Sequence, residues 1–216
     1  MAITLYGYPN SGSAAVEAAL VLAGVPHQCV DAASWDAASA RDALQALNPL
    51  LQIPTLQWDD GSVMTESAAI LIELGLRHPA SGLLPSAPAA RAQALRGLVY
   101  IAANCYATIG VIDFPNRVIA QPDTAEADRI NACSRDRLHR QWDLFADQWR
   151  PADDAPYLGG DQPGALDLLA SVVSRWSGAR AHLAGSRPAL LALFDRVAAH
   201  PVVGPVMQRH WPEQPA

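Results

Sequence analysis

Two serine hydroxyls in a turn-forming loop are the first groups in this sequence whose type and spacing could do chemistry. Ser11 and Ser13 close the segment 8–13, Tyr-Pro-Asn-Ser-Gly-Ser, between a short β-prone run and an apolar helical pattern. A serine at a helix start can cap the helix. It can also donate a hydrogen bond to an anion held at the same helix N-terminus. The spacing alone leaves both hydroxyls open as the donor.

Two more short segments have the chemistry of a peptide-binding site. Ile53-Pro54 stands at the start of a β-prone run, where a proline without an N–H suits an edge or a bend. A main chain left unpaired at such a place can bind an extended peptide by strand addition. Glu66-Ser67 directly precedes an apolar helical pattern. The free N–H groups at a helix start attract a carboxylate, and the Glu66 side chain could balance an ammonium group.

Composition excludes several other kinds of function. Cys29, Cys105 and Cys133 form no C-x-x-C pair, and the histidines form no H-x-x-x-H pair, so we expect neither a disulfide scaffold nor a metal site. The chain has no lysine, which excludes Schiff-base and P-loop chemistry. A net charge of −6 disfavours nucleic-acid binding. Apolar runs such as 18–25 are too short to cross a bilayer, and no signal peptide is visible. The three unpaired cysteines indicate a reducing compartment, so a cytoplasmic location is expected.

The order of helical and strand patterns divides the chain into two parts. Residues 1–79 alternate as β-α-β-α-β-β-α, which predicts a small α/β domain with a parallel βαβ unit and an antiparallel hairpin. A proline-rich linker spans 80–89, and 90–216 has only helical stripes, which predicts an all-α bundle. The expected helices include one that Ser186 caps and one with a capping box at Asp123.

The order and spacing of three segments resemble the glutathione transferase family. They are L-Y-G-Y-P-N-S-G-S at 5–13, N-P-L-L-Q-I-P-T-L at 48–56 and D-D-G-S-V-M-T-E-S-A-A-I at 59–70. The resemblance covers essentially the whole chain. It implies a thioredoxin-like N-terminal α/β domain followed by an all-α helical-bundle C-terminal domain. It also implies a cis peptide bond before Pro54 and an N-terminal capping box from Gly164 to Asp167.

The same resemblance implies a role for each candidate residue. Ser11 matches the catalytic serine of serine-type members, which stabilises the glutathione thiolate by a hydrogen bond; Ser13 is the rival. No cysteine stands in this loop, so a thiol-reductase mechanism lacks its nucleophile. The glutathione-binding residues would be Gln52, Ile53, Pro54, Glu66 and Ser67. The electrophile pocket would take Tyr8, Tyr106 and Arg117.

The resemblance therefore implies a transferase that uses glutathione as co-substrate and needs no metal. The second substrate would be a small hydrophobic electrophile. The reaction would be conjugation (as in detoxification), isomerisation or peroxide reduction. The chain would form a homodimer. Leu51 departs from the family pattern, since relatives often have His or Lys there near the glycyl carboxylate. A non-catalytic module that binds a ligand or a protein is the alternative. The segment 44–54 looks somewhat like the zeta class, although the serine loop lacks the S-S-C signature of that class.

Overall fold

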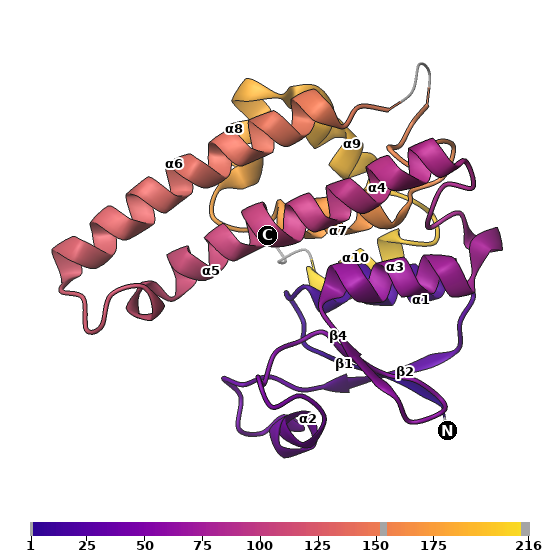
Figure 1. Ribbon diagram of the computed structural model, residues 1–216, viewed down its shortest axis with the longest axis horizontal. Helices are drawn as coiled ribbons and strands as arrows, with labels where there is room; N and C mark the ends of the chain where they lie inside the picture. The colour runs from indigo at the N-terminus through magenta and orange to yellow at the C-terminus, as the bar shows by residue number, and fades with distance from the viewer. Residues whose placement is uncertain (1, 152–154, 213–216) are drawn as a thin grey trace.

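The computed structural model describes residues 2–151 and 155–212 of the 216 residues. A four-stranded sheet with three helices is followed by a helical region (Figure 1). The first part consists of β1 Ile3–Gly7, α1 Ser13–Leu22, β2 His27–Asp31, α2 Arg41–Leu47, β3 Thr55–Gln57, β4 Val63–Thr65 and α3 Ser67–Arg77. The second consists of the 3-10 turn η1 Pro79–Ser81, α4 Pro88–Tyr100, the π-helical segment η2 Ile101–Tyr106, α5 Ala107–Asp113, the 3-10 turn η3 Pro115–Arg117, α6 Thr124–Gln148, α7 Ala165–Val173, α8 Ala179–Ser186, α9 Pro188–Ala198 and α10 Gly204–His210.

The sheet topology brings three chain turns to one edge. The strand order is β2-β1-β3-β4, with β1 and β2 parallel and the other two pairs antiparallel. Thr55 pairs with both Tyr6 and Thr65, so β1 and β4 end where β3 begins. The loop into α1, the loop before β3 and the start of α3 therefore meet at the same edge of the sheet.

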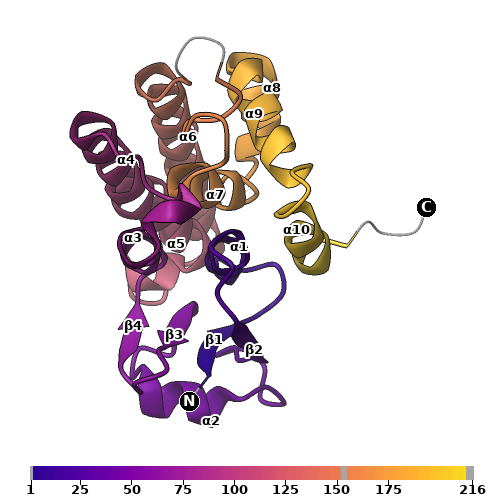
Figure 2. The same ribbon diagram turned by 90° about the vertical axis from the view of Figure 1, so that its right-hand side faces the viewer.

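Helices α1 and α3 form the layer between the sheet and the helical region, while α2 covers the other sheet face (Figure 2). Helix α1 is buried along nearly its whole length, from Ser13 to Leu20. It ends as its sequence predicts, because Gly24 adopts a left-handed φ of 65° and the Val25 N–H donates to the Leu20 carbonyl. This layer fixes the N-termini of α1 and α3 against the helical region.

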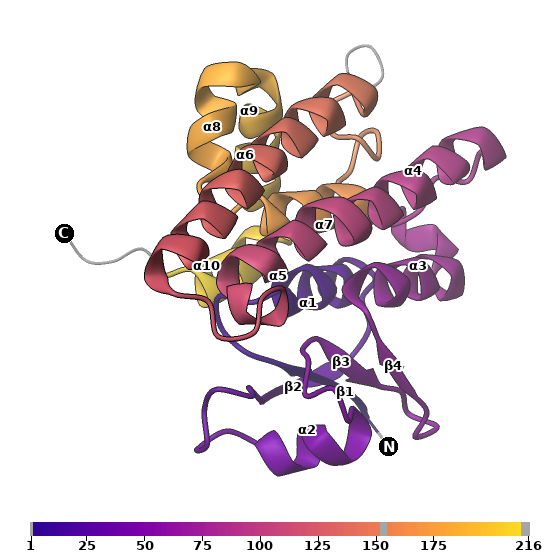
Figure 3. The ribbon, with the colours of Figure 1, turned by 60° about the vertical axis from the view of Figure 1, so that its left-hand side comes forward.

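A continuous helical stretch runs from Pro88 to Asp113 through α4, η2 and α5. Its most apolar 18-residue window has a mean hydropathy of 1.4, so by length and composition alone the stretch could cross a membrane. Polar residues such as Asn104 interrupt it, so no single apolar run in the sequence reveals it. In the fold, α4 packs on α7 and α5 packs on α6 (Figure 3), which is the environment of a core helix in a helical region.

The expected fold class is confirmed, and two details of the helical region are corrected. Ser186 does not cap the following helix; it is the last residue of α8, and its hydroxyl donates to Asp143 at 2.6 Å. Helix α9 begins instead with Pro188, whose fixed φ suits the first turn. Helices α8 and α10 were not expected. The boundaries of the two parts at 79 and 90 stay a prediction.

The Asp167 carboxylate joins the start of α7 to the loop before it. It is fully buried and accepts N–H bonds from Leu158, Gly159 and Gly164 at 2.8 to 2.9 Å. The next N–H, that of Ala165, donates to the Leu83 carbonyl at 2.8 Å, so the segment after α3 is tied to the same point. The predicted capping role of Asp167 is thus confirmed and extended to two further amides.

We expect Asp167→Ala to lower the free energy of unfolding by about 3 kcal/mol or more, because three N–H groups lose their fully buried acceptor. Urea unfolding followed by circular dichroism measures this. Asp123→Ala is the matched control, since the Asp123 capping box on α6 is solvent-exposed; its loss should cost about 1 kcal/mol. Equal losses in the two variants would contradict the structural role of Asp167.

Candidate active site

A cleft of about 520 Å³ opens at the sheet edge where the three turns meet the helical region. Its floor comes from Asn10, Ser11, Gly12, Ser34, Trp35, Asn48, Leu50, Leu51, Gln52, Ile53, Pro54, Thr65, Glu66, Ser67 and Ala68. Its helical wall comes from Ala102, Tyr106, Ala107, Ile109, Gly110, Asp113, Phe114, Arg117 and Trp176. The size is that of an ordinary small-molecule site.

Ser11 and Ser13 face different spaces, although their hydroxyls touch. The two Oγ atoms are 2.8 Å apart, and the Ser11 hydroxyl donates to the Tyr8 carbonyl at 2.6 Å. Ser11 lines the cleft, whereas Ser13 is 1% exposed and lines a smaller cavity behind it. A Cβ on Gly7 would lie 2.5 Å from the Ser13 side chain, so glycine is needed there for this packing. The structure therefore puts only the first of the two hydroxyls at the cleft.

Asn48 holds the loop that precedes β3. Its buried side-chain amide donates to the Gln52 carbonyl at 3.0 Å and to the Thr55 hydroxyl at 3.1 Å. Its Oδ1 atom accepts the Leu50 N–H at 3.1 Å. One side chain thus clamps both ends of this loop from within.

The main chain of Ile53 is unpaired at the cleft. The peptide bond to Pro54 is cis, as expected. Within the described residues, neither the N–H nor the carbonyl of Ile53 has a hydrogen-bond partner. Unpaired main-chain groups at the end of a sheet can pair with an added extended segment. Gln52 and Pro54 flank this position, and both line the cleft.

Glu66 and Ser67 lie at the start of α3. Ser67 is the first helical residue and Glu66 the N-cap residue, with no side-chain capping bond. The first N–H groups of a helix have no partner inside it, and their partial positive charge favours a bound anion. Glu66 is exposed at the same place. This pair thus presents amide donors and a carboxylate side by side.

Backbone strain is concentrated around the cleft. Five non-glycine residues in the described ranges have a positive φ, and three of them, Asn10, Leu51 and Glu66, line the cleft. Such conformations cost on the order of 1–3 kcal/mol each and tend to occur at ligand sites. The positive φ values at Leu51 and Glu66 could not be predicted from the sequence, because neither residue type favours this region of φ.

The helical wall is aromatic around Tyr106, the last residue of the π-helical segment. Its ring packs on Trp176 with centroids 5.8 Å apart, and burial raises its pKa to about 12. A Cβ on Gly12 would collide with the Tyr106 hydroxyl, so that hydroxyl lies against the serine loop. The Arg117 guanidinium stacks 3.9 Å from the Phe114 ring centroid at the outer end of the wall. The cleft thus has a polar peptide-like floor and an aromatic wall.

Of the residues expected in the electrophile pocket, Tyr106 and Arg117 line the cleft and Tyr8 does not. Tyr8 lines the smaller cavity, where its hydroxyl donates to Asp36 at 2.9 Å and its ring packs edge-on to Trp35. Trp176, which the sequence did not single out for this site, also lines the cleft while it packs against the core. Its apolar helical spacing resembles that of core tryptophans, so no sequence signal separated it from them.

Positive charge is scarce around the cleft. Among its lining residues in the described ranges, Arg117 is the one arginine, and it lies on the helical wall. Arg41 begins α2 and does not line the cleft, so it does not replace the basic residue that is missing at Leu51. On the floor, Gln52 offers a polar side chain without charge.

We expect Asn48→Ala to lower the free energy of unfolding by about 2 kcal/mol, because a buried side chain loses three hydrogen bonds. Amide hydrogen exchange of the loop at 50–55 should accelerate at the same time, since the clamp is lost. Gln45→Ala on the exposed face of α2 is the control and should change neither. Unchanged exchange in the Asn48 variant would show that the clamp does not hold the loop.

Known proteins are similar to this chain over nearly its full length. The profile of the glutathione S-transferase N-terminal domain matches residues 13–76. An uncharacterised GST-like protein of Escherichia coli, YncG, is 32% identical over 96% of this chain and 98% of its own length. Maleylacetoacetate isomerase of Pseudomonas aeruginosa is 27% identical, with 97% of each chain covered.

A solved structure shares the whole fold. It is a glutathione transferase homologue from Sulfitobacter with bound glutathione, which superposes with a TM-score of 0.80 at 23% identity and covers 95% of this chain and 96% of its own. The full-length relationship to YncG, the matched N-terminal domain and the shared fold together identify the chain as a member of the glutathione S-transferase family.

Proposed function

We propose that this protein is a glutathione transferase, in which Ser11 stabilises the glutathione thiolate for attack on a small hydrophobic electrophile. The observation that carries the proposal is the cleft itself. One space brings together the Ser11 hydroxyl, the unpaired main chain of Ile53 and the free N-terminus of α3. These are the partners that a thiol, a peptide backbone and a carboxylate require.

Each part of glutathione has a matching group on the cleft floor. The cysteinyl N–H and carbonyl pair with the carbonyl and N–H of Ile53, as an added strand does. The γ-glutamyl carboxylate accepts from the first amides of α3 at Ser67, and the γ-glutamyl ammonium faces the Glu66 carboxylate. Gln52 and Pro54 border the peptide. The glycyl carboxylate finds no cation on the floor, so we expect weaker binding than in relatives with a basic residue at position 51.

The chemical task is to keep the sulfur ionised near neutral pH. A free thiol has a pKa of about 8.5, so only a few per cent is ionised at pH 7. A hydrogen bond to the thiolate and the positive end of α1 both favour the anion. A decrease of about two pKa units corresponds to about 2.7 kcal/mol, which two such interactions can supply.

The contact between the two serines gives each a separate role. When Ser11 turns its proton from the Tyr8 carbonyl to the sulfur, the Ser13 hydroxyl lies 3.3 Å from that carbonyl and can donate to it instead. Ser11 is then the catalytic hydrogen-bond donor and Ser13 a positioning residue. Neither acts as a nucleophile, and the proton of the glutathione thiol leaves to solvent.

The aromatic wall selects the second substrate. Tyr106, Trp176 and Phe114 offer flat apolar surface, and the protonated Tyr106 hydroxyl has no hydrogen-bond partner within the described residues. It can donate to an electrophile that gains negative charge on oxygen as sulfur adds. Conjugation, isomerisation and peroxide reduction all use this arrangement. Isomerisation is favoured by one observation, the 27% identity to a maleylacetoacetate isomerase.

A non-catalytic binding module is the second candidate, because the floor lacks a basic residue. A glutathione-affinity column separates the two functions. Retention with turnover of an aryl halide or an unsaturated ketone supports the transferase. Failure to bind glutathione in solution favours the binding module.

We expect Ser11→Ala to lower kcat/KM about 100-fold, as loss of one anion-stabilising donor does. Ser13→Ala should lower it by less than about tenfold, because its effect is exerted through Ser11. The thiolate absorbance of bound glutathione, titrated against pH, should show a raised thiol pKa in the Ser11 variant. If Ser13→Ala alone produced the large loss, Ser13 would be the donor instead.

We expect Tyr106→Phe to reduce turnover of oxygen-bearing electrophiles about tenfold, because the hydroxyl would donate to the oxygen that gains charge. The Kd for glutathione should stay unchanged, because none of the residues proposed to hold glutathione forms a hydrogen bond with this hydroxyl. Turnover of an alkyl halide, in which the leaving halide takes the charge and no oxygen does, is the internal control. Equal losses with both substrates would show that the phenol acts only through packing.

Two further properties complete the proposal. Exposed large apolar side chains at Leu50, Leu76 and Val99 suit a homodimer in which each sheet region faces the helices of the partner. Light scattering of the purified protein tests this. The cysteines at 29, 105 and 133 are free thiols, which fits a cytoplasmic location and detoxification there.

A further inference from the structure

A second cavity, of about 230 Å³, lies behind the serine loop and outside the cleft. It is bounded by α1, by the edge strand β2 and by the C-terminal helix α10. Glu17, Cys29, Arg209 and His210 are among its lining residues. The proposed transfer reaction uses none of these four groups, although Glu17 is an ionisable residue that is only 7% exposed.

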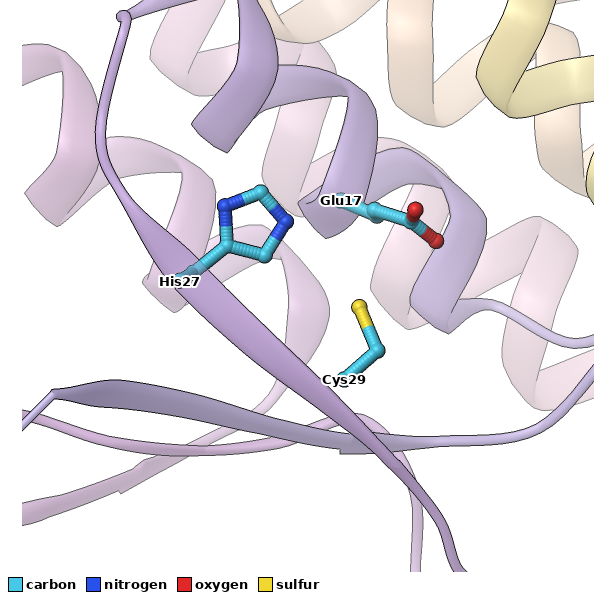
Figure 4. A group of neighbouring side chains, drawn as sticks. All are labelled: Glu17, His27 and Cys29. Carbon is cyan, nitrogen blue, oxygen red and sulfur yellow. The ribbon is translucent and has the colours of Figure 1, made fainter.

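Three side chains of different ligand types converge beside this cavity. Figure 4 shows Glu17 projecting from α1 toward β2, and His27 and Cys29 projecting from β2 toward α1. One ligand atom of each lies within 4.8 Å of the others. His27 and Cys29 are two positions apart on one strand, so they share a face. Carboxylate, imidazole and thiol thus meet between two regular elements.

The His27 ring has the orientation of a metal ligand. Its Nδ1 atom lies 2.8 Å from the Val25 carbonyl, and a carbonyl can only accept, so Nδ1 carries the proton. The lone pair is then on Nε2. Metal-binding histidines in proteins typically donate their other N–H to a carbonyl or carboxylate in this way. Nε2 has no hydrogen-bond partner within the described residues.

The Glu17 carboxylate is held in place by the C-terminal helix. Its Oε2 atom is 2.7 Å from His210 Nε2, and its Oε1 atom pairs with Arg209. His210 is buried, whereas the Arg209 side chain is 57% exposed. Arg209 can therefore swing into solvent and free Oε1 for a cation, while His210 keeps the carboxylate oriented. Such a supporting contact is a regular feature of protein metal sites.

We propose that Glu17, His27 and Cys29 form a binding site for a divalent transition-metal ion, Zn²⁺ by the chemistry of the ligands, with a fourth position open to the cavity. A thiolate and an imidazole favour Zn²⁺ over Mg²⁺ or Ca²⁺, which prefer oxygen. Three protein ligands and an open position are a common zinc arrangement. The Cys29 proton leaves to solvent when the ion binds.

The separations between the three ligand atoms fit a tetrahedral zinc site after small side-chain movements. Zinc bonds of about 2.0–2.3 Å in a tetrahedron put the ligand atoms roughly 3.3–3.8 Å apart. The present separations of up to 4.8 Å close to this range by side-chain rotation. The sequence predicted no metal site because it lacks paired motifs such as C-x-x-C or H-x-x-x-H. The present set instead joins one helix residue to two strand residues.

The test uses the full-length protein, treated with a chelator and then titrated with Zn²⁺ in a calorimeter. Co²⁺ serves as a second probe, because bonding to a thiolate gives a charge-transfer band in the near ultraviolet. We expect one ion per chain, the cobalt band, and no competition from excess Mg²⁺. Cys29→Ser should abolish the band and weaken Zn²⁺ binding at least about tenfold. His27→Gln should weaken it similarly.

Cys133→Ser is the matched control, since Cys133 is an exposed thiol on α6 far along the chain from the site. It should bind Zn²⁺ like the wild type. Both cysteines are exposed, so their serine variants should keep the wild-type circular dichroism spectrum. The proposal is overturned if no stoichiometric binding occurs, if Cys29→Ser binds unchanged, or if Cys133→Ser loses binding equally. None of these results bears on glutathione turnover, which the affinity column and the Ser11 variant test separately.

Discussion

The candidate site is made of main-chain polar groups that the fold leaves without hydrogen-bond partners at one edge of the sheet. Because β1 and β4 end where β3 begins, the starts of α1 and α3 and the main chain of Ile53 all come to one sheet edge. Buried amides and carbonyls need partners. The described chain supplies no partner for the main chain of Ile53 or for the first amides of α3, so these donors and acceptors are open to a ligand.

Side chains in other parts of the structure hold the segments at that edge in position. The Asn48 side chain fixes the loop before β3, and Gly7 and Gly12 let the serine loop approach its neighbours closely. Asp167 fixes the start of α7 and thereby the segment that follows α3. The helical region adds the aromatic wall around Tyr106. The N-terminus of α1 borders the cleft, and Glu17 on the same helix borders the second cavity. Helix α1 therefore contributes to both the proposed glutathione site and the proposed metal site.

Local signals in the sequence predicted much of this and failed where long-range packing decides. Glycine and proline positions predicted the ends of α1 and the bend at Pro54 because their backbone preferences are intrinsic. Ser186 was misread because a serine before a helical stripe looks like a cap, and only the tertiary contact with Asp143 reveals its role. The positive φ values and the exposure of Trp176 to the cleft arise from packing between distant segments. Of the predicted site residues, all but Tyr8 and Ser13 line one cleft.

A crystal structure of this protein with glutathione would show whether the tripeptide binds along the cleft floor. We expect the cysteinyl main chain to pair with both polar groups of Ile53 and the sulfur to lie within hydrogen-bond distance of Ser11 Oγ. The γ-glutamyl carboxylate should lie at the start of α3. An empty cleft at saturating glutathione, or a bound peptide whose sulfur points away from the serine loop, would contradict it.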